Sequence, residues 1–184
     1  PEVVVTPRDA QAVAAVMRLP NRHHIPVTPR GAGTGLSGGA LPVHGGIVLS
    51  TRALNPILEI DTTNLMAVVE PGVITQVFQE AVEAAGLFYP PDPASRGSCF
   101  LGGNLAECSG GPRAVIYGVT KDFVTGVEAV LPTGDFVRHG GKLLKNVTGY
   151  NLTQLLIGSE GTLGVITKIY FRLLPLPRHR LLLL

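Results

Sequence analysis

The chain has 184 residues, a formal net charge of +2, 45% hydrophobic residues and 15% charged residues. This composition indicates a globular protein rather than a disordered one, and the length fits one domain or two small lobes that share a core. The small net charge, the absence of tryptophan and an aromatic content of 5% argue against nucleic acid as a partner.

The first segment has the pattern of a strand, a helix and a second strand. Residues 3–5 are all valine and predict a buried strand, and Thr6 has the features of a helix N-cap. An apolar helix face over residues 13–17 is predicted to end near Pro20, and a second strand covers residues 25–28. Such a unit makes parallel strands and binds ligands at the loops that follow them.

A glycine-rich loop follows the second strand. Thr28 to Ala40 contains five glycines in thirteen residues and no acidic residue. Glycine lets a ligand approach the main chain closely, and consecutive N–H groups can form a concave anion site. The side chains of Arg30, Thr34 and Ser37 add hydrogen-bond donors. The loop therefore predicts a pyrophosphate site.

Other interpretations of this loop fit less well. It lacks the Gly-Lys-Ser/Thr ending of a Walker A loop, and no acidic residue follows at the spacing that a Rossmann fingerprint requires. A mobile glycine linker remains the alternative, because many glycine-rich loops are only connections.

The middle of the chain alternates between strands and helices. Strands are predicted over residues 47–50, 57–60 and 66–70. A helix follows, with an apolar face formed by Val73, Val77, Ala81 and Ala84. Prolines at 90, 91 and 93 then stiffen a loop, which is either a rigid wall beside a ligand or a tight connection.

Two further glycine clusters lie in the second half, over residues 102–111 and 158–164. The middle of the first of these predicts a short helix, whose N-terminus would favour an anion. Between the clusters, residues 123–131 and 136–138 predict a hairpin, and Asn151 caps a short helix. Its inward residues would be Leu152, Leu155 and Leu156. A last strand covers residues 165–173.

The ordered set of motifs resembles the FAD-binding domain of the FAD-linked oxidases, the PCMH-type or vanillyl-alcohol-oxidase family. The matching stretches are PRGAGTGLSGGA at 29–40, PPDPAS at 90–95, CFLGGNLAECSGGPRAVIYG at 99–118, KNVTGYN at 145–151 and GSEGTLGVIT at 158–167. Within the family, the likeness is greatest to glycolate oxidase D-subunits and D-lactate and D-2-hydroxyglutarate dehydrogenases.

The resemblance implies an α+β fold of two lobes with FAD between them. Residues 1–54 would form the small lobe, and residues 55–175 the larger lobe, an antiparallel sheet with flanking helices. Residues 176–184 would begin a linker to a C-terminal domain that covers the flavin and brings the catalytic histidines. No catalytic residue is therefore expected in this chain.

The resemblance also implies which residues bind the cofactor. Those of the first cluster are Arg30, Gly31, Ala32, Gly33, Thr34, Gly35, Ser37 and Gly38, near the pyrophosphate. Those of the flavin side are Pro91, Asp92 and Ser95. The groove is completed by Gly102, Gly103, Asn104, Ser109 and Gly110. The adenosine and ribitol side is held by Glu160, Gly161, Val165 and Ile166.

Some relatives attach FAD covalently through a histidine in the first loop, but Thr34 stands near that place, so we expect non-covalent FAD. The implied function is the FAD-binding portion of a 2-hydroxy-acid oxidoreductase that passes hydride from the substrate to the flavin. A non-catalytic FAD-binding subunit or module of such a complex is the alternative, and a UDP-sugar-reducing enzyme on the same fold fits the motifs less well.

The remaining features bear on location and metals. Two cysteines, Cys99 and Cys108, form no disulfide framework, and the five histidines show no ligand spacing, so no metal site is expected. No apolar run approaches the roughly 20 residues of a membrane span. We expect a cytoplasmic protein that has sister subunits, with any membrane association coming through these partners. The final four leucines would start a strand of a neighbouring domain.

Overall fold

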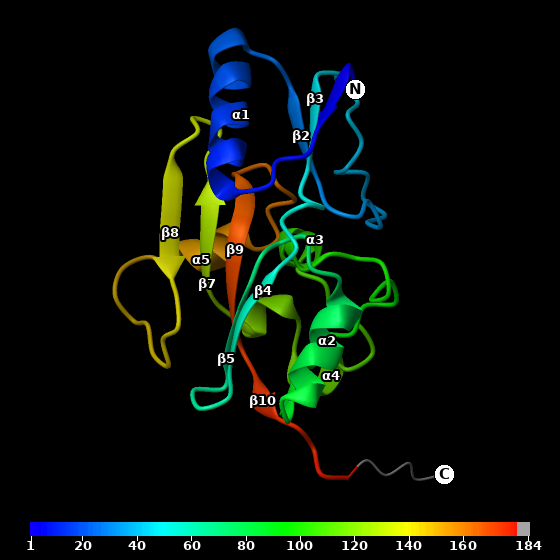
Figure 1. Ribbon diagram of the computed structural model, residues 1–184, viewed down its shortest axis with the longest axis vertical. Helices are drawn as coiled ribbons and strands as arrows, with labels where there is room; N and C mark the ends of the chain where they lie inside the picture. The colour runs from blue at the N-terminus through cyan, green and yellow to red at the C-terminus, as the bar shows by residue number, and fades with distance from the viewer. Residues whose placement is uncertain (180–184) are drawn as a thin grey trace.

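The computed structural model describes residues 1–179 and contains two main sheets stacked along one long axis (Figure 1). The first sheet is three-stranded and parallel, in the order β1-β3-β2. Its strands are β1 (Val3–Val5), β2 (Val27–Arg30) and β3 (Ile47–Ser50), and α1 (Ala10–His23) connects β1 to β2. The predicted parallel unit is confirmed, with β3 inserted between the two strands that α1 joins.

Three details of this first segment were predicted wrongly. β1 is an edge strand, so Val3 and Val4 are 46% and 60% exposed rather than buried. The N-cap of α1 is Asp9, whose carboxylate accepts a hydrogen bond from the N–H of Ala12 (2.7 Å), and not Thr6. The helix also continues past Pro20 to His23.

The second sheet has five strands, all antiparallel, in the order β4-β5-β9-β7-β8. The strands are β4 (Ile57–Asp61), β5 (Met66–Val69), β7 (Val124–Val130), β8 (Phe136–Gly140) and β9 (Val165–Arg172). The β-branched residues of β9 predicted a strand, and the structure confirms it. This strand lies at the centre of the sheet and pairs with β5 and β7. The predicted hairpin is β7 and β8.

Helices pack against this sheet and complete the main core. α2 (Thr75–Ala84) buries Phe78 and Val82, and α3 (Leu101–Glu107) buries Leu101 and Leu105. Val77 was predicted to lie on the buried face of α2, but it is 49% exposed. The buried face of this helix is therefore rotated relative to the predicted one. α5 (Leu152–Leu156) is capped by Asn151 as predicted, but of its three leucines predicted to point inward only Leu156 is buried.

A second, smaller core joins the two sheets. It contains Val13 and Met17 of α1, Leu49 of β3, and Val130 and Val165 at the ends of β7 and β9. The three-stranded sheet ends at Ser50 and the five-stranded sheet begins at Ile57. The proposed lobe boundary between residues 54 and 55 falls in this interval and stays a prediction, as does the linker from residue 176.

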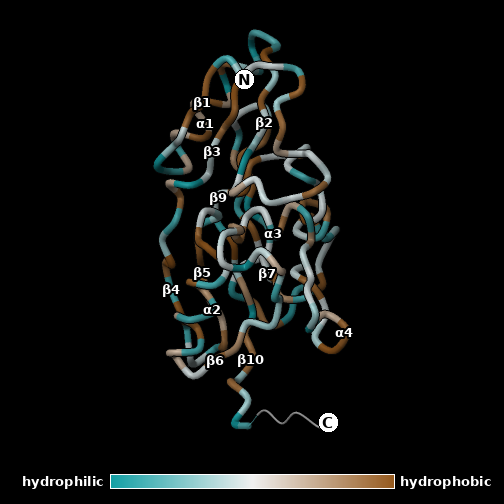
Figure 2. The backbone as a smooth tube through the Cα atoms, turned by 90° about the vertical axis from the view of Figure 1, so that its right-hand side faces the viewer, coloured by the Kyte–Doolittle hydropathy of each residue, from teal (hydrophilic) through white to brown (hydrophobic). Residues whose placement is uncertain are grey.

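The remaining elements lie at the far end of the molecule. β6 (Leu87–Phe88) pairs with β10 (Leu174–Pro175), and α4 (Ala114–Tyr117) forms an apolar protrusion (Figure 2) in which Val115 and Ile116 are exposed. No helix in residues 1–179 is long and apolar enough to cross a bilayer. The strand predicted at the final leucines lies outside the described residues.

Candidate functional site

A groove lies where the two sheets meet, and all three glycine clusters contribute to it. Its larger part has a volume of about 420 Å³ and a smaller extension has about 70 Å³. The two parts share Pro29, Gly31, Gly103, Ala106 and Glu160, so they form one continuous depression. The larger part alone has the size of a small-molecule or cofactor site.

The first wall is the loop after β2, and Arg30 holds it closed. The Arg30 guanidinium donates a hydrogen bond to the carbonyl of Ala40 (3.2 Å), which joins the two ends of the loop. The side chain folds against Gly33, whose φ of +72° is in the left-handed region. A side chain at position 33 would meet the guanidinium and strain the backbone, so glycine is required there.

The second wall is α3, which approaches the first wall through two glycines. A Cβ built on Gly31 would lie 3.8 Å from the backbone N and Cα of Gly103, so the two main chains are in near contact. A Cβ on Gly103 would meet no atom within 4 Å, because that side of the helix faces the groove.

The third wall is the cluster at residues 158–164, and the C-terminal end of α3 fixes its position. The N–H groups of Gly158 and Glu160 donate to the carbonyls of Leu105 (3.1 Å) and Ala106 (3.0 Å). The Leu105 carbonyl also accepts the N–H of Cys108 at the helix C-cap (3.1 Å), and the two bonds from the loop fasten it to the end of α3. α3 is therefore the element on which the other two clusters converge.

Two carboxylates face the first loop. The Ser37 hydroxyl lies 3.0 Å from Oε2 of Glu160 and 3.1 Å from Oε1 of Glu107. A hydroxyl has one proton, so Ser37 donates to one carboxylate at a time. Added Cβ atoms at Gly35 and Gly39 would lie 2.8 Å from Glu107 and 3.1 Å from Glu160, so bare main chain lies directly against both acids.

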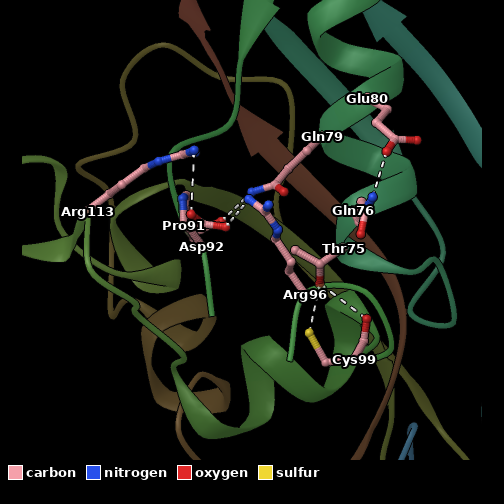
Figure 3. Close-up of polar contacts among 9 residues, drawn as sticks. All are labelled: Thr75, Gln76, Gln79, Glu80, Pro91, Asp92, Arg96, Cys99 and Arg113. Carbon is pink, nitrogen blue, oxygen red and sulfur yellow. Dashed lines mark hydrogen bonds and ion pairs between the residues drawn. The ribbon is translucent and has the colours of Figure 1, made fainter. Parts of the chain in front are cut away.

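The proline-rich loop at 90–95 is held by α2 and by an ion-pair cluster (Figure 3). Asp92 pairs with Arg96 (2.9 Å) and Arg113 (3.5 Å), one with each carboxylate oxygen. Gln79 of α2 donates a hydrogen bond to the carbonyl of Pro91 (2.8 Å). These contacts position the following residues, Ala94 and Ser95, which line the groove.

Most of the residues that the sequence suggested for cofactor binding line the groove. They are Arg30, Gly31, Ala32, Gly33, Thr34, Gly35, Ser95, Gly102, Gly103, Asn104, Ser109, Glu160, Gly161, Val165 and Ile166. Five others do not line it, namely Ser37, Gly38, Pro91, Asp92 and Gly110. Ser37 contacts groove residues directly, whereas Pro91 and Asp92 make the contacts within the protein described above. The binding role of each residue stays a prediction.

The sequence did not single out several residues that line the groove. Glu107, Cys99, Phe100 and Thr51 are among them. Glu107 stands at the end of a predicted helix, where an acidic residue is ordinarily solvent-exposed, and only its contact with Ser37 reveals its position. Cys99 is both buried and at the groove wall.

The family described as FAD binding domain matches residues 1–140 of the chain. The chain belongs to this FAD-binding domain family. The first two glycine clusters lie within that match, and the third, at 158–164, lies beyond it and contributes to the same groove. The structure gives this FAD-binding domain a two-sheet α+β fold of the PCMH type.

Similar proteins extend over the whole chain. It is 50% identical over 184 residues to glycolate oxidase subunit GlcD of Bacillus subtilis (strain 168), covering 100% of this chain and 39% of that protein. It is 44% identical to D-lactate dehydrogenase of Anaerostipes hadrus, covering 97% of this chain and 37% of that protein. The chain thus spans about two fifths of the length of the curated relatives that it matches.

A solved structure has the same fold. The alkyldihydroxyacetonephosphate synthase structure superposes with a TM-score of 0.84 at 28% identity, over 96% of this chain and 32% of that one. The fold of this FAD-binding domain is therefore shared with a protein that differs from it at most sequence positions.

The groove suits FAD chemically. Backbone N–H groups of the loop at 31–35 suit a diphosphate, and open space at Gly103 admits a flat ring close to the main chain. The carboxylates of Glu107 and Glu160 are acceptors that suit the hydroxyls of a ribose or ribityl chain. The donor and acceptor sets of the groove thus match a molecule with both phosphates and hydroxyls.

Proposed function

We propose that the chain is the FAD-binding portion of a flavin-dependent 2-hydroxy-acid oxidoreductase of the glycolate oxidase or D-lactate dehydrogenase type. The observation that carries the proposal is the single groove built from all three glycine clusters. The likeness to glycolate oxidase subunit GlcD over the entire chain supports the substrate class.

The residues of this chain bind and orient the cofactor in this proposal. The first loop and α3 hold the diphosphate and the main chain of Gly103 borders the ring system, while Glu107 and Glu160 accept hydrogen bonds from sugar hydroxyls. Bound FAD would supply the two-electron acceptor for the hydride of the hydroxyl-bearing carbon. The general base and the substrate wall would come from a further domain, so the chain 1–184 by itself is expected to be inactive.

We also propose that FAD is held without a covalent bond. Thr34 lines the groove, and no histidine does so among the residues that the structure describes. Acid precipitation of the purified protein tests this point. All of the yellow flavin should appear in the supernatant, and flavin that stays with the pellet would contradict the proposal.

The decisive experiment measures flavin content and turnover together. The full-length protein should contain FAD and should reduce an artificial electron acceptor with glycolate, D-lactate or another 2-hydroxy acid, while the chain 1–184 should bind FAD without turnover. Robust turnover by the chain 1–184 would refute the division of roles. FAD binding by the full-length protein with no turnover on any 2-hydroxy acid would favour the non-catalytic subunit or module.

The partners and location follow from this function and are proposals too. Sister subunits of an oxidase complex would accept the electrons, and the protein would lie in the cytoplasm with any membrane attachment made by those subunits. Purification of the native complex under mild conditions and identification of the co-purifying chains test this. A native protein that is monomeric and free of partners would refute it.

A further inference from the structure

A buried polar network lies behind the wall of the groove that α3 forms. It consists of Thr75 at the start of α2, Cys99 in the loop before α3, and Asn104 within α3. Thr75 is 0% exposed and the other two are 3% exposed. Asn104 and Cys99 line the groove, whereas Thr75 does not. Thr75 can therefore influence a ligand only through its neighbours.

The contacts of the Thr75 hydroxyl fix the direction of its hydrogen bonds. Its oxygen lies 3.2 Å from both the carbonyl oxygen and the Sγ atom of Cys99 (Figure 3) and 2.6 Å from Nδ2 of Asn104. A carbonyl oxygen only accepts hydrogen bonds, so the single hydroxyl proton is directed to Cys99. The hydroxyl oxygen then accepts the N–H of the Asn104 amide.

This arrangement determines which end of the Asn104 amide is available to a ligand. One N–H of the NH₂ group donates to Thr75, and no hydrogen bond to Oδ1 is found among the residues that the structure describes. Since Asn104 lines the groove and Thr75 lies behind it, the carbonyl end faces the groove. Oδ1 is therefore available to accept a hydrogen bond from a donor group of a ligand in the groove.

We propose that Thr75 is a positioning residue for FAD, because it turns the Asn104 amide so that Oδ1 accepts a hydrogen bond from an N–H or O–H group of the cofactor. The inference rests on the proposed function. Thr75 acts without touching the cofactor. Were the amide reversed, its NH₂ group would face the groove and would suit acceptors, such as phosphate oxygens, instead of donors.

A double-mutant cycle on FAD affinity in the full-length protein tests the proposal. Thr75→Val keeps the side-chain shape and removes the hydroxyl, and it should weaken FAD binding about tenfold, the loss of one hydrogen bond of about 1.4 kcal/mol. Thr75→Ser keeps the hydroxyl, so the FAD affinity of this variant should stay within about twofold of that of the wild type. Thr75→Val should have no further effect in the Asn104→Ala background.

A matched variant separates this effect from loss of stability. Thr153 is also buried and donates a hydrogen bond to the carbonyl of His139 (3.2 Å), away from the groove. Thr153→Val should lower the unfolding temperature of the flavin-free protein and leave the dissociation constant of FAD unchanged. If Thr75→Val does not fold, Thr75→Cys replaces it, since a thiol of similar size is a weak acceptor.

Three outcomes would overturn the positioning role. They are an unchanged FAD affinity in a folded Thr75→Val protein, an equal loss in the wild-type and Asn104→Ala backgrounds, and no rescue by Thr75→Ser. A wild-type protein that binds no FAD at all would instead refute the proposed function, and the two failures are thereby distinguished.

Discussion

The Ser37 hydroxyl lies 3.0 Å from Oε2 of Glu160, a residue 123 positions further along the chain. The same hydroxyl lies 3.1 Å from Oε1 of Glu107 at the end of α3. Through this hydroxyl the exposed part of the first glycine loop is hydrogen-bonded to one or the other of the two remaining walls of the groove. This contact restrains the exposed part of the loop.

Removal of this contact should weaken FAD binding. In Ser37→Ala the first loop loses its connection to Glu107 and Glu160, so binding must restrict a freer loop, and we expect an affinity about two- to tenfold lower. Fluorescence titration with FAD measures the change. Thr133→Ala removes a comparable exposed hydroxyl bond to Asp135 (2.7 Å) in the β7–β8 turn and should have no effect on FAD. Equal effects of the two variants would contradict the prediction.

Gly103→Ala should separate cofactor binding from folding. The new methyl group meets no protein atom within 4 Å, and alanine is favoured over glycine in a helix by about 0.5–1 kcal/mol. The unfolding temperature without flavin should stay equal or rise, while the methyl group occupies the groove and lowers FAD affinity at least about tenfold. Thermal unfolding and FAD titration of the same preparation check both parts.

The neighbouring glycine gives the contrast. A Cβ on Gly102 would lie 2.5 Å from Cβ of Pro71, so Gly102→Ala should destabilise the flavin-free protein itself. Equal unfolding temperatures of Gly102→Ala and Gly103→Ala without flavin would contradict the close packing of α3 against Pro71.

Asp92→Asn tests whether this carboxylate serves the cofactor or the fold. The resemblance implied a place on the flavin side, but the structure engages both oxygens with Arg96 and Arg113. Loss of these partly exposed ion pairs should cost about 1 kcal/mol of unfolding free energy and change FAD affinity less than about twofold. Urea unfolding and FAD titration distinguish the two roles. A large loss of affinity with unchanged stability would favour a cofactor contact.

The stability of the five-stranded sheet should depend on pH through Glu128. Burial acts to raise the pKa of this carboxyl, but the hydrogen bond from Arg138, the charge of Lys168 and the hydroxyl of Thr167 together hold its pKa below the ordinary value of 4.5. A lowered pKa in the folded state contributes stability that is fully present above pH 4.5 and lost as the pH falls through the folded value.

Arg138→Gln should therefore destabilise the protein in a pH-dependent manner. It removes the charged hydrogen-bond donor from the almost buried Glu128 carboxylate, so the free energy of unfolding at pH 7 should fall. The difference from the wild type should shrink as Glu128 becomes protonated in both proteins at low pH. Urea unfolding between pH 3 and 8 measures this, and a difference independent of pH would show that the ion pair is not its cause.

The sequence was most informative where the local pattern and the tertiary structure agree. The runs of β-branched residues at 47–50 and 165–172 form strands, and the Asn151 side chain accepts the N–H of Gln154 (3.0 Å), as its position before a helix indicates. The glycine clusters themselves, and their convergence on one site, followed from the motifs and their order.

Burial of individual faces was harder to predict, because it depends on neighbours that are distant in the sequence. Val3 is apolar, yet β1 has a partner strand on one side only. α5 is five residues long, so a single turn faces the sheet and Leu155 remains 61% exposed. Thr75 and Glu107 carry no local signal, since their importance comes only from contacts with Asn104 and Ser37.

The dispersion of the groove along the chain has a consequence during protein synthesis. Its walls come from residues 29–40, 94–109 and 159–166, and β9 must enter the centre of the larger sheet before the last wall is in place. A nascent polypeptide still attached to the ribosome therefore presents no complete flavin site until the whole of this region has left the exit tunnel. Cofactor capture therefore has to wait for β9 and the segment at 159–166, and a nascent chain that ends before them has only part of the groove.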